Sequence, residues 1–251
     1  MTSSQHSLPE TIVITSRYCG PADSGNGGYT CGRLAARLPG VAEVTLRRPP
    51  PLDTGLSLVG RPQNGAALMQ GDDVIAEARP ASLAMDVPPC PGLAAAADGS
   101  ARYHGFVEHA FPGCFVCGPE RHIGDGLRIF AGDVDGGGLV ASAWTPQGWL
   151  GDADGVVRPE FVWAALDCPG AWAWLAELDD PLVLGRLTAS LEAPVTTGRP
   201  HIVGGWRLER EGRKFQSGTA VWRADGTLCA RAKATWIQVD RARFARQAPA
   251  A

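Results

Sequence analysis

Asp167 is the residue whose type and surroundings most clearly suggest chemistry. It is the only acid in the very apolar stretch from Phe161 to Leu175. A carboxylate buried without a partner is costly and tends to have a raised pKa. Acids with perturbed pKa values are often functional. Two plainer interpretations stay open: Asp167 caps the segment that begins at Pro169, or it bonds to a buried partner.

The run Asn26-Gly27-Gly28 is a second candidate for chemistry. Glycines let backbone N–H groups come close to a ligand, because no Cβ stands in the way. The alternative is a simple turn whose asparagine caps the helical pattern that follows.

Cysteines form a third candidate group. Cys114 and Cys117 have the spacing of a metal-ligand pair, but no second such pair occurs in the chain. We therefore expect packed thiols and no metal or other cofactor, with a structural zinc site and a redox pair as the alternatives. Seven cysteines are an odd number, and the polar stretch 1–9 does not resemble a secretory signal. We expect reduced thiols and a cytoplasmic protein.

The elements that would position these residues are clearest in the second half of the chain. Strand-like alternation marks residues 187–191, 201–209, 215–223 and 227–239, with the hairpin signal Asp225-Gly226 before the last. Upstream, 159–178 is too apolar for a surface helix and predicts a buried one, which Pro169 kinks or divides. Residues 127–129 and 139–144 suggest a hairpin before that helix.

The first half repeats this order less clearly. Residues 11–18 and 41–47 are typical of strands, and 29–38 has helical spacing. The segments 49–55 and 71–79 resemble 194–198 and 224–233 in composition and in order. We therefore expect an N-terminal domain at 10–80, a linker at 81–111, a C-terminal domain at 112–240 and a disordered tail at 241–251.

Residues 114–239 resemble a known family. Cys114-Phe115-Val116-Cys117-Gly118, followed by Gly126-Leu127, is similar to the CFxCG…GL opening of hotdog-fold thioesterases related to the phenylacetate-pathway family. Residues 187–239 resemble the closing strands of that family, and the likeness over 11–80 rests on the internal repeat. The resemblance implies an α+β double hotdog: two tandem hotdog domains, each a long antiparallel sheet wrapped around a central helix, that form a pseudo-dimer.

The resemblance also implies a reaction. Hotdog thioesterases hydrolyse acyl thioesters with a carboxylate on the central helix, which is the nucleophile or the base for water. A backbone N–H at a helix start stabilises the developing oxyanion. Asp167 falls at the carboxylate position, but Arg158-Pro159-Glu160 replaces the HGG motif at the start of its own helix, and Pro159 has no N–H.

The first half carries the complementary features. Asn26-Gly27-Gly28 occupies its HGG position, whereas the position that matches Asp167 is near Ala35. We therefore predict one composite catalytic site formed by Asp167, Asn26, Gly27 and Gly28, and a mirror-image site without activity. Four further residues are predicted to bind substrate, two through hydroxyl groups and two through charge near CoA phosphates: Thr196, Thr197, Arg199 and Arg213.

The composition of the chain limits the kinds of partner that we expect. Lys plus Arg total 23 against 26 for Asp plus Glu, which argues against a general nucleic-acid binder. No apolar run approaches the length of a membrane span. The expected partner is an acyl-CoA or acyl-carrier substrate, with a homodimer as a further expectation. Two alternatives to hydrolysis remain: a non-catalytic binder of acyl-CoA or a small molecule, and an enoyl-CoA hydratase or dehydratase.

Overall fold

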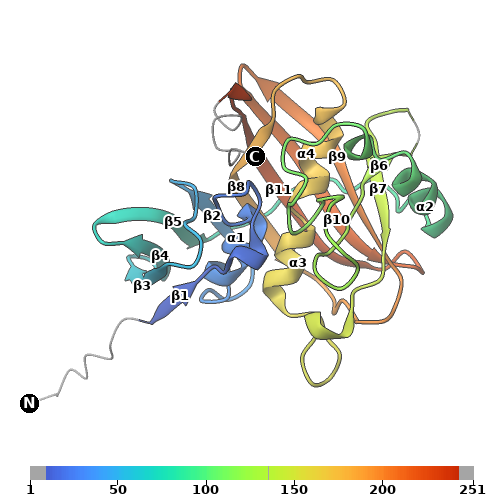
Figure 1. The fold of residues 1–251 in the computed structure, drawn as a ribbon. Coiled ribbons are helices and arrows are strands. Elements are labelled where there is room, and N and C mark those ends of the chain that lie inside the picture. Colours follow the sequence, from blue (N-terminus) through green and yellow to red (C-terminus); the bar gives the residue numbers. More distant parts are fainter. Residues whose placement is uncertain (1–9, 135, 243–251) are drawn as a thin grey trace, which may run out of the picture.

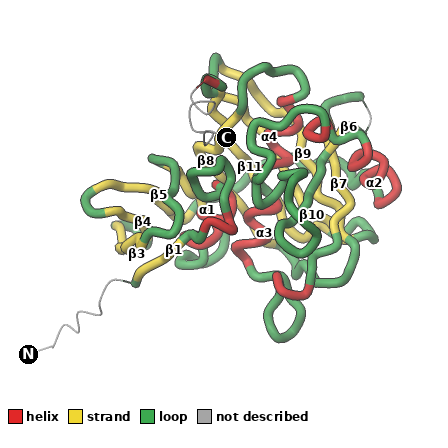
Figure 2. The backbone as a smooth tube through the Cα atoms, viewed as in Figure 1, coloured by secondary structure: helices red, strands yellow, loops and turns green. Residues whose placement is uncertain are grey.

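The computed structural model describes residues 10–134 and 136–242, and within them eleven strands form one antiparallel sheet (Figures 1 and 2). The sequence expectations for 1–9 and for most of the tail at 241–251 lie outside the described residues. The strand order is β1-β3-β4-β5-β2-β8-β11-β10-β9-β7-β6. The strands are β1 Thr11–Val13, β2 Ala42–Leu46, β3 Gly55–Arg61, β4 Gly65–Gln70, β5 Asp73–Pro80, β6 Gly132–Asp133, β7 Leu139–Trp144, β8 Leu182–Leu191, β9 His201–Glu211, β10 Lys214–Arg223 and β11 Leu228–Gln238.

The sheet joins the two halves of the chain. Strands β1 to β5 come from the first half and β6 to β11 from the second, and β2 pairs with β8 at the junction. Val44 lies opposite Leu187 there, and both side chains are fully buried. The predicted strands at 187–191, 201–209, 215–223 and 227–239 are confirmed as β8 to β11, with somewhat different ends.

The helices are α1 Gly27–Ala35, α2 Leu93–Ala101, α3 Pro159–Ala165 and α4 Cys168–Leu175, with short 3-10 helices at Ser16–Tyr18, His104–Phe106 and Gly148–Leu150. Helices α1, α3 and α4 lie together in the middle of the molecule, whereas α2 lies apart from them beside β6 and β7 (Figure 1). The predicted buried helix is confirmed and is divided into α3 and α4, with Asp167 as the N-cap of α4. Pro169 lies in the first turn of α4, where its missing N–H costs no helical hydrogen bond.

Helices α1 and α3 cross closely because α1 has glycines at the contact. A Cβ added to Gly28 would lie 2.6 Å from the Trp163 carbonyl oxygen, and one added to Gly32 would lie 2.6 Å from the Glu160 Cα. Both distances are too short for nonbonded atoms. The two glycines therefore bring the start of α1 against the end of α3, where Asp167 follows.

Two sequence expectations need correction. Residues 127–129 form no strand: the N–H groups of Leu127 and Ile129 instead donate to the carbonyls of Phe115 and Val116. The strand partner of β7 at that edge is β6. The strand expected at 11–18 ends at Val13, and a 3-10 helix follows it.

The predicted connector at 81–111 contains a packed helix. The hydroxyl groups of Ser217 and Thr219 in β10 donate hydrogen bonds to the carbonyls of Gly170 and Leu166, so these two side chains face α3 and α4. Successive side chains of a strand point to opposite faces of the sheet, so Ala220 faces the other side. Ala96 of α2 belongs to the same apolar cluster as Ala220. Helix α2 therefore covers the sheet face opposite α4. No helix in the described part of the chain has both the length and the apolar character to cross a membrane.

Candidate active site

A cavity of about 460 Å³ lies where the start of α1 meets α4 and strands β8 and β11. Asn26 and Gly27 from the first half and Asp167 from the second half line it together. Much of the remaining wall is apolar and includes Leu46, Phe111, Trp172, Leu175, Leu178, Leu182, Val183, Leu184, Trp236 and Ile237. A volume in this range suits a small organic ligand.

Asp167 is held by one oxygen and unpartnered at the other. Its Oδ2 accepts hydrogen bonds from Asn26 Nδ2 and from the Gly28 N–H, each at 2.8 Å. Its Oδ1 is buried and has no partner among the described residues. The residue is 2% exposed. An unpaired buried carboxylate oxygen is costly, and here it belongs to a residue that lines the cavity.

Burial also changes the acidity of this group. Loss of solvation raises the pKa of Asp167 to about 7. The hydrogen bond from the Gly28 N–H opposes that rise, the nearby Cys114 adds to it, and the bond from Asn26 opposes it. The carboxyl group therefore exchanges its proton in the physiological range.

Asn26 connects the two helices. It is the N-cap of α1, and its Oδ1 accepts from the Tyr29 N–H at 2.8 Å. Because the oxygen is used there, the amide nitrogen is directed at Asp167. Gly28 donates its N–H to the same carboxylate, whereas the Gly27 N–H, at the first position of the helix, has no acceptor among the described residues.

The mirror-image position lacks these groups. Arg158 is the N-cap of α3 without a capping side-chain bond, and Pro159 follows it with no N–H to donate. Glu160 pairs loosely with Arg158 at 3.8 Å. Ala35, buried at the end of α1, has no carboxylate. The structure thus brings Asp167, Asn26 and Gly27 together at one cavity, and Gly28 contacts Asp167 through its N–H. The catalytic role of these four residues stays a prediction.

The four predicted substrate-binding residues do not line this cavity. Thr196 and Thr197 lie beside 155–156, where the Thr197 hydroxyl donates to the Gly155 carbonyl at 3.2 Å. Arg199 lies in the same β8–β9 connection, and Arg213 is in the β9–β10 turn. Residue type alone does not determine whether a side chain lines the same cavity as Asp167, and the role of the four residues in binding substrate stays a prediction.

Three other arginines line the cavity: Arg47, Arg48 and Arg241. Arg47 pairs with Glu77 and Arg48 with Asp73, both on exposed parts of the surface. Sequence reasoning missed them, although the pair Arg47-Arg48 at the end of the predicted strand 41–47 was a usable signal. Arg241 contacts Glu108 and the Asp179 carbonyl, which no local pattern indicated.

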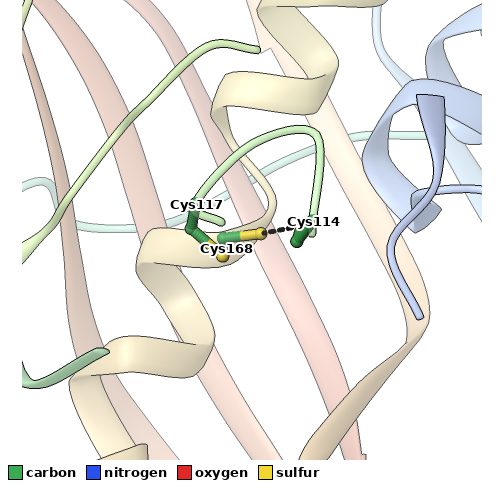
Figure 3. A group of neighbouring side chains, drawn as sticks. All are labelled: Cys114, Cys117 and Cys168. Carbon is green, nitrogen blue, oxygen red and sulfur yellow. Dashed lines mark hydrogen bonds between the residues drawn. The ribbon is translucent and has the colours of Figure 1, made fainter. Parts of the chain in front are cut away.

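The cavity wall also contains three cysteines and an unpartnered tryptophan nitrogen. Cys168 joins Cys114 and Cys117, and all three are buried (Figure 3). Hydrogen bonds from the Cys117 and Cys168 thiols hold the pKa of Cys114 well below its ordinary value. The indole N–H of Trp236 is buried and has no acceptor among the described residues. Asp167 Oδ1 and Trp236 Nε1 therefore both lack a partner in the part of the chain that the structure describes, and both belong to residues of the cavity wall.

Comparison with known proteins identifies the architecture. No protein-family model and no curated protein matches the sequence. Solved structures match over most of both chains. A candidate thioesterase II from Thermobifida fusca has a TM-score of 0.59 at 13% identity, with 92% of this chain and 96% of that chain covered.

Two further structures agree with it. The TesB protein MAP1729c of Mycobacterium avium subspecies paratuberculosis has a TM-score of 0.58 at 14% identity, covering 88% of this chain and 90% of that one. A hotdog-fold protein of unknown function from Alicyclobacillus acidocaldarius has a TM-score of 0.55 at 14% identity, covering 92% of each chain. The chain therefore has the hotdog fold, which it shares with structures described as thioesterases.

Proposed function

We propose that the protein hydrolyses an acyl-CoA or a related acyl thioester at a single composite site. The observation that carries the proposal is the state of Asp167: Oδ2 is held by Asn26 and Gly28, and Oδ1 has no partner beside a mainly apolar cavity. The likeness to thioesterase structures supports the same reaction class.

The free groups fit the steps of thioester hydrolysis. Asp167 Oδ1 either removes a proton from water, whose oxygen then adds to the thioester carbonyl carbon, or adds to that carbon itself. The Gly27 N–H is the donor for the resulting oxyanion, aided by the positive end of α1. The carbon–sulfur bond then breaks, and the thiolate leaves and takes up a proton. In the nucleophilic route, water afterwards hydrolyses the acyl-aspartate.

The same proposal explains why one site is expected and not two. Asp167 lies eight positions after Pro159, and Ala35 lies eight positions after Gly27. We treat 10–80 and 112–240 as two hotdog domains related as a pseudo-dimer, each contributing one helix. Each domain has lost the half of the machinery that the other retains.

The cavity suggests the kind of substrate. Its apolar wall suits an acyl chain, and Arg47, Arg48 and Arg241 supply positive charge for the phosphates of CoA. The seven cysteines, all present as free thiols, suit a reducing cytoplasm. We further expect a homodimer, and neither nucleic acid nor membrane as a partner.

The test is thiol release from short, long and aromatic acyl-CoAs. Asp167→Asn should reduce turnover by at least about 100-fold, the usual scale for a general base, while the protein stays folded. Glu160→Gln is the matched control, because it removes a carboxylate at the inactive mirror position. We expect that variant to keep the wild-type rate.

Other outcomes separate the alternatives. Acyl-CoA binding without release by any variant would favour a non-catalytic binder. Hydration of an enoyl-CoA would favour a hydratase. Full activity in Asp167→Asn would remove Asp167 from the mechanism.

A further inference from the structure

Three thiols from two distant segments meet at one wall of the cavity. Cys114 and Cys117 lie in the loop before β6, and Cys168 is the first residue of α4 (Figure 3). Their three Sγ atoms all lie within 4.8 Å of one another, and Cys114 and Cys168 are 3.8 Å apart. The residues are 3%, 3% and 7% exposed.

The spacing of the sulfurs matches a metal site. Two thiolates on one tetrahedral zinc ion lie about 3.8 Å apart, because each Zn–S bond is about 2.3 Å long. The Cys114–Cys168 distance has this value. The loop that holds Cys114 and the start of α4 thus place one pair of sulfur atoms at the separation that a bound zinc ion requires, and the Cys117 sulfur lies within 4.8 Å of both.

His109 stands behind this cluster and not within it. Its Nδ1 accepts the Phe111 N–H at 2.9 Å, which leaves the ring proton on Nε2. Nε2 lies 3.4 Å from Cys117 Sγ and therefore donates to that sulfur. A protonated Nε2 cannot bind a metal, but an N–H donor beside a ligand sulfur orients it and stabilises its negative charge.

The ligand set has an open side. Among the described residues, the cluster of mutually close ligand atoms contains these three thiols alone. All three residues also line the cavity. Three protein ligands with an open fourth position are typical of zinc sites at which water or a substrate binds the ion, whereas structural sites are closed by four protein ligands. Soft sulfur ligands favour a zinc-class cation over magnesium or calcium.

We propose that Cys114, Cys117 and Cys168 bind one zinc-class divalent cation whose fourth coordination position faces the cavity. Binding converts the three thiols into thiolates and releases their protons. The ion ties the loop to the start of α4, directly after Asp167. The proposal departs from the sequence expectation of packed thiols without a metal, and the metal measurements below decide between the two.

The first test measures metal in the full chain, purified without a histidine tag. We expect one zinc ion per chain, and Cys114→Ser, Cys117→Ser and Cys168→Ser should each abolish stoichiometric binding. Cys229→Ser is the matched control, because Cys229 is buried in β11 away from the cavity. His109→Ala should keep the stoichiometry and weaken zinc binding by about 10- to 100-fold, as loss of a partner behind a ligand usually does.

A second measurement needs no variant and is independent of catalysis. Cobalt(II) bound to the wild-type apoprotein should show sulfur-to-cobalt charge-transfer absorption and the intense visible bands of a tetrahedral ion. Zinc should abolish both. Absence of stoichiometric metal, cobalt binding without sulfur charge transfer, or a disulfide among the three cysteines in the purified protein would each overturn the proposal.

Discussion

The amide nitrogen of Asn26 lies 2.8 Å from Oδ2 of Asp167, although the two residues are 141 positions apart in the chain. The contact joins the start of α1 to the start of α4. It also fixes which carboxylate oxygen is held and which is free, because the Gly28 N–H bonds to the same Oδ2. The orientation of the Asp167 carboxyl group therefore depends on residues from the other half of the chain.

Variants of Asn26 should separate its two roles. Asn26→Ala removes both the cap of α1 and the donor to Asp167, so we expect a loss of about 0.5–2 kcal/mol in stability together with reduced turnover. Asn26→Ser keeps a good capping side chain but cannot reach Asp167 with a donor. It should unfold near the wild-type denaturant midpoint and still lose activity. Wild-type thiol release by Asn26→Ser would show that the donor is dispensable.

The close crossing of α1 and α3 should tolerate no added methyl group. Gly32→Ala places a Cβ 2.6 Å from the Glu160 Cα, so the helices must separate, at a cost of about 1–3 kcal/mol. Denaturant unfolding measures this cost. Gly148→Ala is the control, because its Cβ would meet nothing within 4 Å. Equal unfolding midpoints for the two variants would contradict the account of the crossing.

Much of the architecture could be predicted because the signals were local. Alternating side chains predicted strands at 187–191, 201–209, 215–223 and 227–239, and the density of apolar residues predicted a buried helix with a break near Pro169. Asp167 was recognisable because burying a carboxylate in such an apolar helix is costly unless the group has a partner or a function. The pairing of Asp167 with the Asn26 turn was predicted because the second half has the carboxylate but not the glycine turn, whereas the first half has the turn but not the carboxylate.

The parts that were missed depend on long-range contacts. Cys168 lies 51 positions after Cys117, so no spacing rule connects it to that pair. Leu127 to Ile129 bond to the loop at 115–116, and such partners are set by tertiary packing and not by propensity. The prediction that Thr196 and Arg213 bind substrate rests on their chemistry, which contains no information about where they lie relative to the cavity, and neither residue lines it.

Trp236 should contribute a hydrogen bond to the bound ligand. Its indole N–H is buried without an acceptor and belongs to a residue of the cavity wall. Trp236→Phe keeps an aromatic ring and removes the donor, so KM should rise about three- to tenfold, the scale of one hydrogen bond. Trp222→Phe is the control, because Trp222 packs in the apolar cluster on the opposite face. If the two variants have equal KM values, the indole nitrogen of Trp236 does not contribute to substrate binding.

His201 should make the fold sensitive to acid. Burial lowers its pKa below the ordinary value, the bond to the Arg199 carbonyl opposes this, and Arg223 adds to it. Its Nδ1 donates to that carbonyl at 2.8 Å, and its Nε2 faces the Thr196 N–H at 3.4 Å, so a second ring proton would meet a donor.

The folded state therefore binds this proton less readily than the unfolded state does. The contribution of His201 is present above its unfolded pKa of about 6.5 and is lost as the pH falls through that value towards the folded pKa. Denaturant unfolding of wild type and His201→Gln from about pH 8 to about pH 5 measures this difference. Wild type should lose more stability over that range, because glutamine keeps an acceptor for Thr196 and does not titrate. Parallel pH profiles for the two proteins would contradict this assignment.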